Sequence, residues 1–152
     1  MPQIRVFIAD ADIYLRDKIR QLVAMQGDMR IVDEALTVEE VRTKLPEQHP
    51  QILLLDLALP SAKDLPIFTL VEFAAMYSNV ILLAAEVDES CQREALHAGA
   101  TSFQRKTAPA EKLLRAIRLA ARKDRRSYCL WPSPIRFVER RDSSVPNLFA
   151  KS

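Results

Sequence analysis

Short runs of apolar residues alternate along the chain with segments whose apolar positions recur every three to four residues. The runs predict β-strands, because Val, Ile, Leu and Phe fill most of them almost continuously, as in strands buried on both faces. The last run, at 101–106, is short and more polar, as expected of an edge strand. The segments between the runs have the period of amphipathic helices. We expect strands at residues 4–9, 30–35, 51–56, 79–85 and 101–106, and helices at 12–26, 37–45, 64–77, 88–98 and 108–126.

Several residues predict where these helices begin and end. Thr37 precedes Glu40 by three positions, the spacing of a capping box, and Pro46 is expected to end the same helix. Asp64 is expected to cap the next helix at its N-terminus. Gly99 is placed to end the fourth helix in a left-handed conformation.

Five strand–helix units in succession predict an α/β protein with a parallel sheet covered on both faces by helices. In such sheets, functional sites lie at the carboxyl ends of the strands. The residues expected to meet there are Asp10, Asp56, Lys106 and the pair Ala84–Ala85.

Charge is distributed unevenly along the chain, although its net charge is only +2. Residues 1–104 carry 9 Lys and Arg against 16 Asp and Glu, residues 105–126 carry 9 against 2, and residues 127–152 carry 4 against 2. The basic block favours either a solvated helix face or a surface for an acidic partner. It lacks interleaved aromatic residues, so we do not expect this chain alone to bind nucleic acid.

Composition narrows the class of protein further. Hydrophobic residues make up 49% of the chain and charged residues 28%, as in an ordinary globular domain. The two cysteines predict neither a disulfide framework nor a zinc site, which fits a cytoplasmic location. No apolar run approaches the roughly 20 residues of a membrane span. We expect residues 1–123 to form one domain, followed by a tail or linker at 124–152.

The ordered set of Asp10, Asp56 with "DLALP", and Lys106 resembles that of response-regulator receiver domains in two-component signalling. The stretches "IRVFIADADIYLR" and "GATSFQRKTAPAEKLLRAI" are most similar to receivers that precede LuxR-type helix-turn-helix output domains. The similarity covers residues 4 to about 122. It implies an α/β, flavodoxin-like doubly wound fold with five parallel strands in the order 2-1-3-4-5. It implies that Asp56 accepts a phosphoryl group from a histidine kinase and that Lys106 pairs with its oxygens. It also implies a Mg²⁺ ion, held by Asp10, Asp56 and a second acid after the first strand.

The chain departs from the family pattern at positions that matter for this chemistry. Ala11 stands where the second acid is expected. Asp12 is the next residue, but a shift of one position points its side chain elsewhere, so a working site would need Asp12 or water to replace the missing ligand. Ala84 stands where the family has Thr or Ser, so the hydroxyl that contacts the phosphoryl group is missing. The aromatic switch position of the fifth strand is Phe103 rather than the commoner Tyr. In the loop after the third strand, Asp64 occupies the usual place of Gly.

These departures lead to a first hypothesis: an atypical receiver, not an enzyme, that is weakly phosphorylated or independent of phosphorylation and acts through protein contacts. Mg²⁺ binding would be weak, and a homodimer would form through the fourth helix, fifth strand and fifth helix, or through the tail. The alternative is a working phosphoacceptor at Asp56 that a histidine kinase phosphorylates, regulating an output domain or partner. Asp56 and Lys106 could also form no more than a structural ion pair. A flavodoxin-like small-molecule binder has little support, because the chain lacks a Gly-rich phosphate loop.

The segment 124–152 is too short for an independent output domain. It contains Trp131 and several other apolar residues among prolines and serines. Two interpretations remain open: a linker to a further domain, or an arm that folds onto this domain or onto a second copy.

Overall fold

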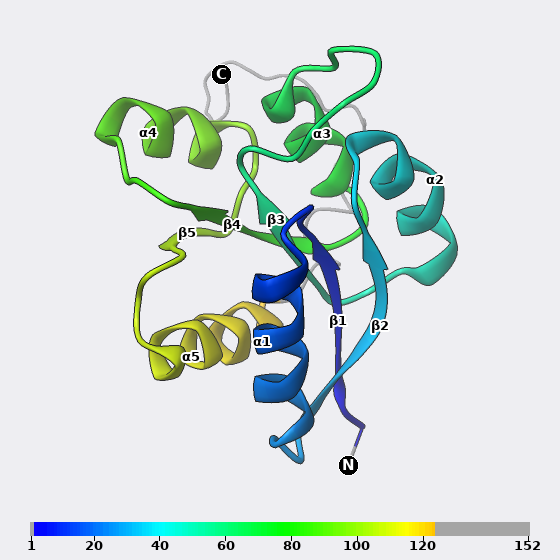
Figure 1. Ribbon diagram of the computed structural model, residues 1–152, viewed down its shortest axis with the longest axis vertical. Helices are drawn as coiled ribbons and strands as arrows, with labels where there is room; N and C mark the ends of the chain where they lie inside the picture. Colours follow the sequence, from blue (N-terminus) through cyan, green and yellow to red (C-terminus); the bar gives the residue numbers. More distant parts are fainter. Residues whose placement is uncertain (1, 124–152) are drawn as a thin grey trace.

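The computed structural model describes residues 2–123, which form five βα units in sequence (Figure 1). The strands are β1 (Ile4–Ala9), β2 (Met29–Ala35), β3 (Ile52–Asp56), β4 (Asn79–Ala84) and β5 (Ser102–Arg105). The helices are α1 (Ile13–Ala24), α2 (Val38–Gln48), α3 (Ile67–Ala74), α4 (Glu89–His97) and α5 (Ala110–Ala121). The predicted elements are therefore all present, with small differences at their ends. The predicted tail at 124–152 lies outside the described residues.

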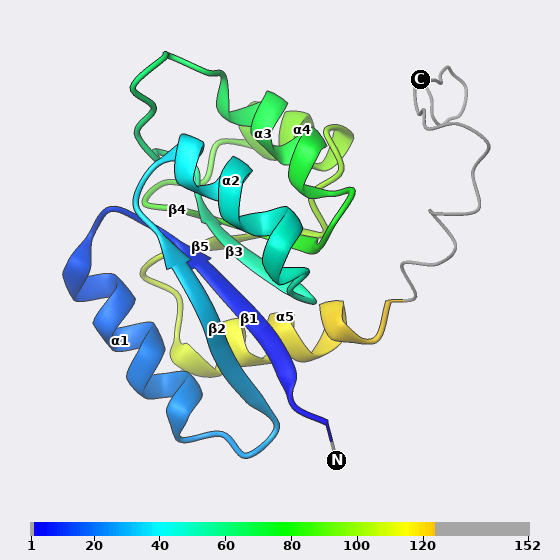
Figure 2. The same ribbon diagram turned by 90° about the vertical axis from the view of Figure 1, so that its right-hand side faces the viewer.

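The strands form one parallel sheet in the order β2-β1-β3-β4-β5, which confirms the predicted topology. Helices α1 and α5 cover one face of the sheet, and α2, α3 and α4 cover the other (Figure 2). Within residues 2–123, no helix combines the length and the apolar character needed to cross a membrane.

The apolar strands are continuous because both of their faces are buried. In β3, Leu53 and Leu55 face the core beneath α2, α3 and α4, whereas Ile52 and Leu54 face the core beneath α1 and α5. All four side chains are fully buried. Each such burial contributes about 1.5–3 kcal/mol to folding. The strand ends at Asp56, so the core fixes the position of this carboxylate.

Helix α2 continues past Pro46, so the predicted stop at this residue is wrong. The helix ends at Gln48, and His49 follows with a left-handed φ of 45°. Pro46 lies in the last turn, where its missing N–H removes a single helical hydrogen bond. The Arg5 guanidinium donates to the carbonyls of Gln48 and His49, which satisfies the end of the helix from outside.

The N-terminus of α3 also differs from the prediction. Asp64 has a left-handed φ of 54°, so it cannot cap the helix, which begins at Ile67 after Pro66. The left-handed conformation is the one for which the family uses Gly, and Asp tolerates it better than most residues. Two other predictions are confirmed. Thr37 Oγ1 accepts the N–H of Glu40 at 3.1 Å, and Gly99 is left-handed with a φ of 115°.

Candidate functional site

Three charged residues from separate units meet at the carboxyl end of the sheet. Asp10 follows β1, Asp56 ends β3 and Lys106 follows β5. The Lys106 ammonium lies 3.0 Å from Asp10 Oδ2 and 3.1 Å from Asp56 Oδ1. The convergence expected from parallel strands is therefore present, and one cation bridges two carboxylates.

The sheet itself holds these residues in place. Ala9 pairs with Leu55 across β1 and β3, so the next residues of the two segments, Asp10 and Asp56, emerge side by side. The N–H of Lys106 donates to the carbonyl of Ala84 at 2.8 Å, which fixes Lys106 beside the end of β4. The geometry follows from strand register, since these residues are far apart in sequence.

Asp10 is fully buried and only partly satisfied. Its Oδ1 accepts the N–H of Asp12 at 2.8 Å. Its Oδ2 contacts Lys106 as an ion pair without hydrogen-bond alignment, and among residues 2–123 this oxygen has no hydrogen-bond partner. Burial raises the pKa of Asp10 above its ordinary value, and the charge of Asp56 adds to the rise, against the Asp12 N–H and Lys106.

Asp56 is 6% exposed, and its Oδ1 also accepts the N–H of Ala58 at 3.0 Å. Burial lowers the pKa of Lys106, but the two carboxylates beside it outweigh burial and leave that pKa raised. Lys106 is therefore a stable cation at neutral pH. When both carboxylates are ionised, the three groups carry one net negative charge.

These residues fit a magnesium ion poorly. The residue beside Asp10 is Ala11, which has no ligand atom, and Asp12 uses its carboxylate to accept the N–H of Tyr14 as the N-cap of α1. Asp12 thus serves the helix and leaves Asp10 and Asp56 as the acids of the site. Across the described range, no group of three or more His, Cys, Asp and Glu residues could hold a metal ion. Mg²⁺ prefers an octahedron of oxygen ligands, of which this site supplies few.

The two predicted switch positions have apolar side chains. Ala84 ends β4 beside Lys106 and is 4% exposed, and its side chain is a methyl group without a hydroxyl. Phe103 lies half-buried on β5 and packs against the core beneath α2, α3 and α4. A phosphoryl group on Asp56 would find no hydroxyl donor at either position.

Sequence reasoning missed an anchor of the loop that follows Asp56. Glu39 of α2 accepts the Ser61 hydroxyl at 2.6 Å and the N–H groups of Ala62 and Lys63 at 3.2 and 3.3 Å. The Ser61 hydroxyl and these N–H groups lower the pKa of Glu39 to about 2. The loop is therefore tied to α2. The sequence offered little signal for this contact, because Glu39 and Ser61 are 22 positions apart.

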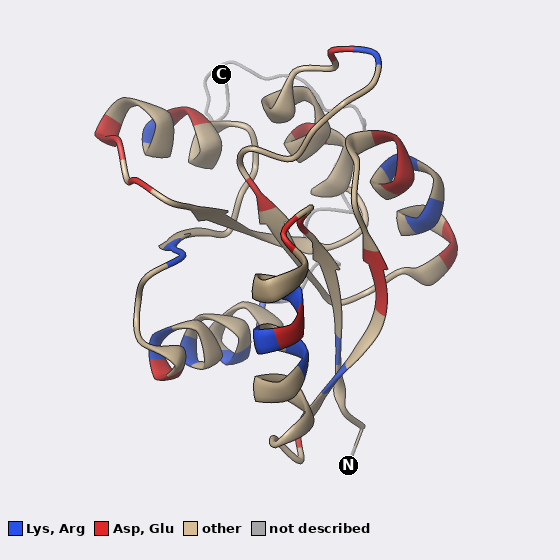
Figure 3. Ribbon diagram, in the orientation of Figure 1, with Lys and Arg blue, Asp and Glu red and all other residues tan. Residues whose placement is uncertain are grey.

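Opposite charges gather on α4 and α5, which cover opposite faces of the sheet on either side of β5 (Figure 3). The segment that includes α4 carries four exposed acids and one exposed base, Arg93. Helix α5 and the two residues after it carry four exposed bases and one exposed acid, Glu111. None of these side chains forms an ion pair within residues 2–123; the four acids are Glu86, Asp88, Glu89 and Glu94, and the four bases are Lys112, Arg115, Arg122 and Lys123.

The sequence is similar to known regulators over the described region. Oxygen regulatory protein NreC of Staphylococcus carnosus is 30% identical over 122 residues, which cover 79% of this chain and 56% of NreC. The transcriptional regulatory protein YhcZ of Bacillus subtilis is 29% identical over 111 residues, which cover 73% of this chain and 52% of YhcZ. The chain thus spans about half the length of these curated relatives.

Solved structures share the fold. The signal receiver domain of the response regulator NarL from Mycobacterium tuberculosis superposes with a TM-score of 0.74 at 20% identity, covering 82% of this chain and all of that chain. The response regulator domain of CheB from Thermotoga maritima superposes with a TM-score of 0.71 at 25% identity, covering 80% of this chain and 98% of that chain. Residues 6–118 match the family model described as the response regulator receiver domain. The chain therefore belongs to the response regulator receiver domain family, whose members are signalling modules rather than enzymes.

Proposed function

We propose that this chain is an atypical receiver module in two-component signalling, weakly phosphorylated or independent of phosphorylation, that acts through protein contacts in the cytoplasm. The observation that carries the proposal is the composition of the site: Lys106 lies between Asp10 and Asp56, at 3.0 and 3.1 Å, but Ala11 and Ala84 add neither an acid nor a hydroxyl to them. The lysine supplies the positive charge of the site. The ligand and the hydroxyl that phosphoryl transfer would use are absent at Ala11 and Ala84.

Electrostatics supports a receiver that is weakly phosphorylated or independent of phosphorylation. Phosphoryl transfer to Asp56 would bring an anion of about −1.5 to −2 charge into a site that already carries net negative charge. Catalysis of such a transfer rests on positioning and on neutralising charge over the equatorial oxygens. Receivers typically meet this need with Mg²⁺, but here the ion would have few ligands besides Asp10 and Asp56. We therefore expect weak Mg²⁺ binding and slow phosphorylation.

The alternative function is that of a working phosphoacceptor for a histidine kinase, a partner that membership of the family implies. Two observations favour it: Asp56 is 6% exposed at the rim, and Lys106 lies beside it. Under this alternative, water takes the place of the metal ligand that Ala11 cannot supply. The chain would then be a phosphoprotein whose modification regulates an output domain or partner, such as the transcription regulation for which YhcZ is named.

We propose the surface of α4, β5 and α5 as the contact that transmits the signal, through a homodimer. These elements lie along one edge of the domain (Figure 1). In a two-fold symmetric pair, the acids of α4 would face the bases of α5 of the second copy. Such an interface is self-complementary, as two-fold symmetry requires.

Intact mass spectrometry after incubation with acetyl phosphate and Mg²⁺ tests the main proposal, with Asp56→Asn as the control. We expect little or no phosphoryl adduct on the wild type. A stoichiometric adduct that is absent from Asp56→Asn would overturn the proposal in favour of the working phosphoacceptor.

A further inference from the structure

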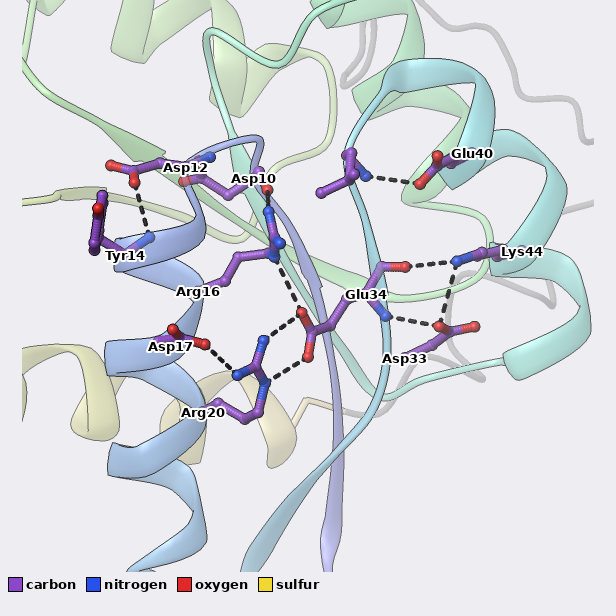
Figure 4. A network of polar contacts seen from close by, with 11 residues as sticks. Asp10, Asp12, Tyr14, Arg16, Asp17, Arg20, Asp33, Glu34, Glu40 and Lys44 are labelled. Atoms are coloured by element: carbon purple, nitrogen blue, oxygen red, sulfur yellow. Dashed lines mark hydrogen bonds and ion pairs between the residues drawn. The ribbon is translucent and has the colours of Figure 1, made fainter.

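Arg16 of α1 connects the candidate site to strand β2 (Figure 4). Its side chain is almost buried, and the residue is 9% exposed. Its Nη1 donates to the backbone carbonyl of Asp10 at 2.8 Å, and its Nε donates to Glu34 Oε1 at 3.1 Å. The planar guanidinium can hold both partners at once, a geometry that lysine does not match.

Glu34 is itself held firmly. Arg20 donates to it twice, with Nε at 2.7 Å from Oε2 and Nη2 at 2.9 Å from Oε1. Lys44 of α2 donates to the backbone carbonyl of Glu34 at 2.8 Å. The hydrogen bonds from Arg20, together with Arg16, lower the pKa of Glu34 despite partial burial. Glu34 is thus an ionised anchor at neutral pH, and Arg16 is fixed between this anchor and Asp10.

The carbonyl that Arg16 holds belongs to the peptide that joins Asp10 to Ala11. On the other side, the N–H of Asp10 donates to the carbonyl of Ala35 at 3.1 Å. With both neighbouring peptides fixed, the Cα–Cβ bond of Asp10 has a set direction, from which Oδ1 reaches the N–H of Asp12 and Oδ2 reaches Lys106. We infer that Arg16 is a positioning residue for the site: anchored by Glu34, it orients the Asp10–Ala11 peptide and so aims the Asp10 carboxylate at Lys106.

The role of Arg16 in signalling rests on the proposed function. Its effect on the position of the Asp10 carboxylate can be tested without phosphoryl transfer. The competing explanation is that Arg16 only contributes a buried ion pair between α1 and β2. Arg20 provides a matched control, because it binds the same Glu34 carboxylate yet makes no contact with Asp10. Arg16→Gln and Arg20→Gln each remove one arginine from Glu34, and only the first releases the Asp10 carbonyl.

The experiment is amide hydrogen exchange with NMR detection on the full chain. The Asp12 amide reports on the aim of the Asp10 carboxylate, and the amides of β3 report on global stability. For Arg16→Gln, we expect the Asp12 amide to exchange about tenfold faster after correction for the β3 amides, the scale of one lost charge-assisted hydrogen bond. Its proton resonance should also move upfield. For Arg20→Gln, we expect a corrected change below about twofold.

Equal behaviour of the Asp12 amide in both variants would overturn the inference and leave Arg16 a structural ion pair. If Arg16→Gln does not fold, Arg16→Lys is judged by the same corrected rate. It keeps a charged donor but cannot hold both partners, so faster Asp12 exchange than in Arg20→Gln is again expected. Failure of the proposed function would appear separately, as a stoichiometric phosphoryl adduct, and would leave these exchange rates unchanged.

Discussion

Lys106 lies 3.1 Å from Asp56, yet it is held almost equally by Asp10 at 3.0 Å. A single ammonium group thus balances two carboxylates that are both shielded from solvent. The pairing of Lys106 with both carboxylates matters for stability as well as for signalling. It matters for stability because a buried carboxylate without a partner is strongly destabilising.

Replacement of Lys106 by Met should therefore destabilise the fold. Breaking a fully buried ion pair by removing one partner costs about 3–5 kcal/mol. The side chain of Lys106 is 21% exposed, so we expect a smaller loss, roughly 1–3 kcal/mol, at pH 7. Urea denaturation followed by circular dichroism measures the loss. Lys18→Met is the control, since Lys18 is exposed on α1 and forms no ion pair among residues 2–123. Equal stability of the two variants would contradict the bridging role of Lys106.

The raised pKa of Asp10 predicts how stability depends on pH. Because the folded protein binds this proton more tightly than the unfolded chain, Asp10 contributes most at a pH below the ordinary value of 3.8. That contribution is lost as the pH rises through the pKa of the folded protein. Asp10→Asn cannot titrate, so its stability relative to the wild type should increase between pH 4 and pH 7. Denaturation curves at several pH values test this, and a difference that stays constant or reverses would refute the prediction.

The contact between Glu39 and the loop after Asp56 predicts a local effect. Glu39→Gln weakens an acceptor of the Ser61 hydroxyl and of two backbone N–H groups. We expect the amides of Ala62 and Lys63 to exchange faster, while the amides of β3 stay unchanged. In the wild type, the same loosening should appear as the pH falls below 4.5 toward 2, where Glu39 gains its proton. Glu47→Gln is the control, because Glu47 lies exposed on the same helix.

The alternation of apolar runs and amphipathic segments was sufficient to predict all five strands and all five helices, because each element buries a large apolar surface. The convergence of Asp10, Asp56 and Lys106 was also predictable, since parallel strands end at one rim. Two element ends were not predictable: the C-terminus of α2 and the N-terminus of α3. Pro46 stays inside α2 because Arg5, from a distant strand, satisfies the helix end.

The contacts made by Glu39 and Arg16 escaped prediction for a similar reason. The Arg16–Glu34 and Glu39–Ser61 contacts join residues 18 and 22 positions apart, and neither Arg16 nor Glu39 stands in an unusual local pattern. Charged side chains on amphipathic helices usually face solvent, so the sequence gives no reason to place Arg16 beneath the site. Only the packing of α1 against β2 brings its guanidinium to Glu34.

The proposed dimer predicts a dependence on charge and salt. Arg115→Glu places an acid on α5 opposite the acids of α4 in a second copy, so the dimer should weaken. Sedimentation analysis at low ionic strength should show more monomer for this variant, and added salt should produce the same shift in the wild type. Lys18→Glu makes the same change of charge on α1, away from the proposed surface, and should leave association unchanged. Equal effects of the two substitutions would mean that net charge alone, and not this surface, governs association.

Restoring the missing groups should restore phosphoryl chemistry. Ala11→Asp supplies a carboxylate beside Asp10, and Ala84→Thr supplies a hydroxyl at the end of β4. We expect the double variant to bind Mg²⁺ more tightly than the wild type and to acquire a phosphoryl adduct from acetyl phosphate that Asp56→Asn abolishes. Ala11→Asp alone should improve Mg²⁺ binding, because the hydroxyl of residue 84 serves the phosphoryl group and not the ion. Metal titration and intact mass spectrometry measure the two effects. If the double variant gains neither Mg²⁺ affinity nor a phosphoryl adduct, the residues at positions 11 and 84 are not what separates this site from a working receiver. The binding of Lys106 to both carboxylates would then limit phosphorylation.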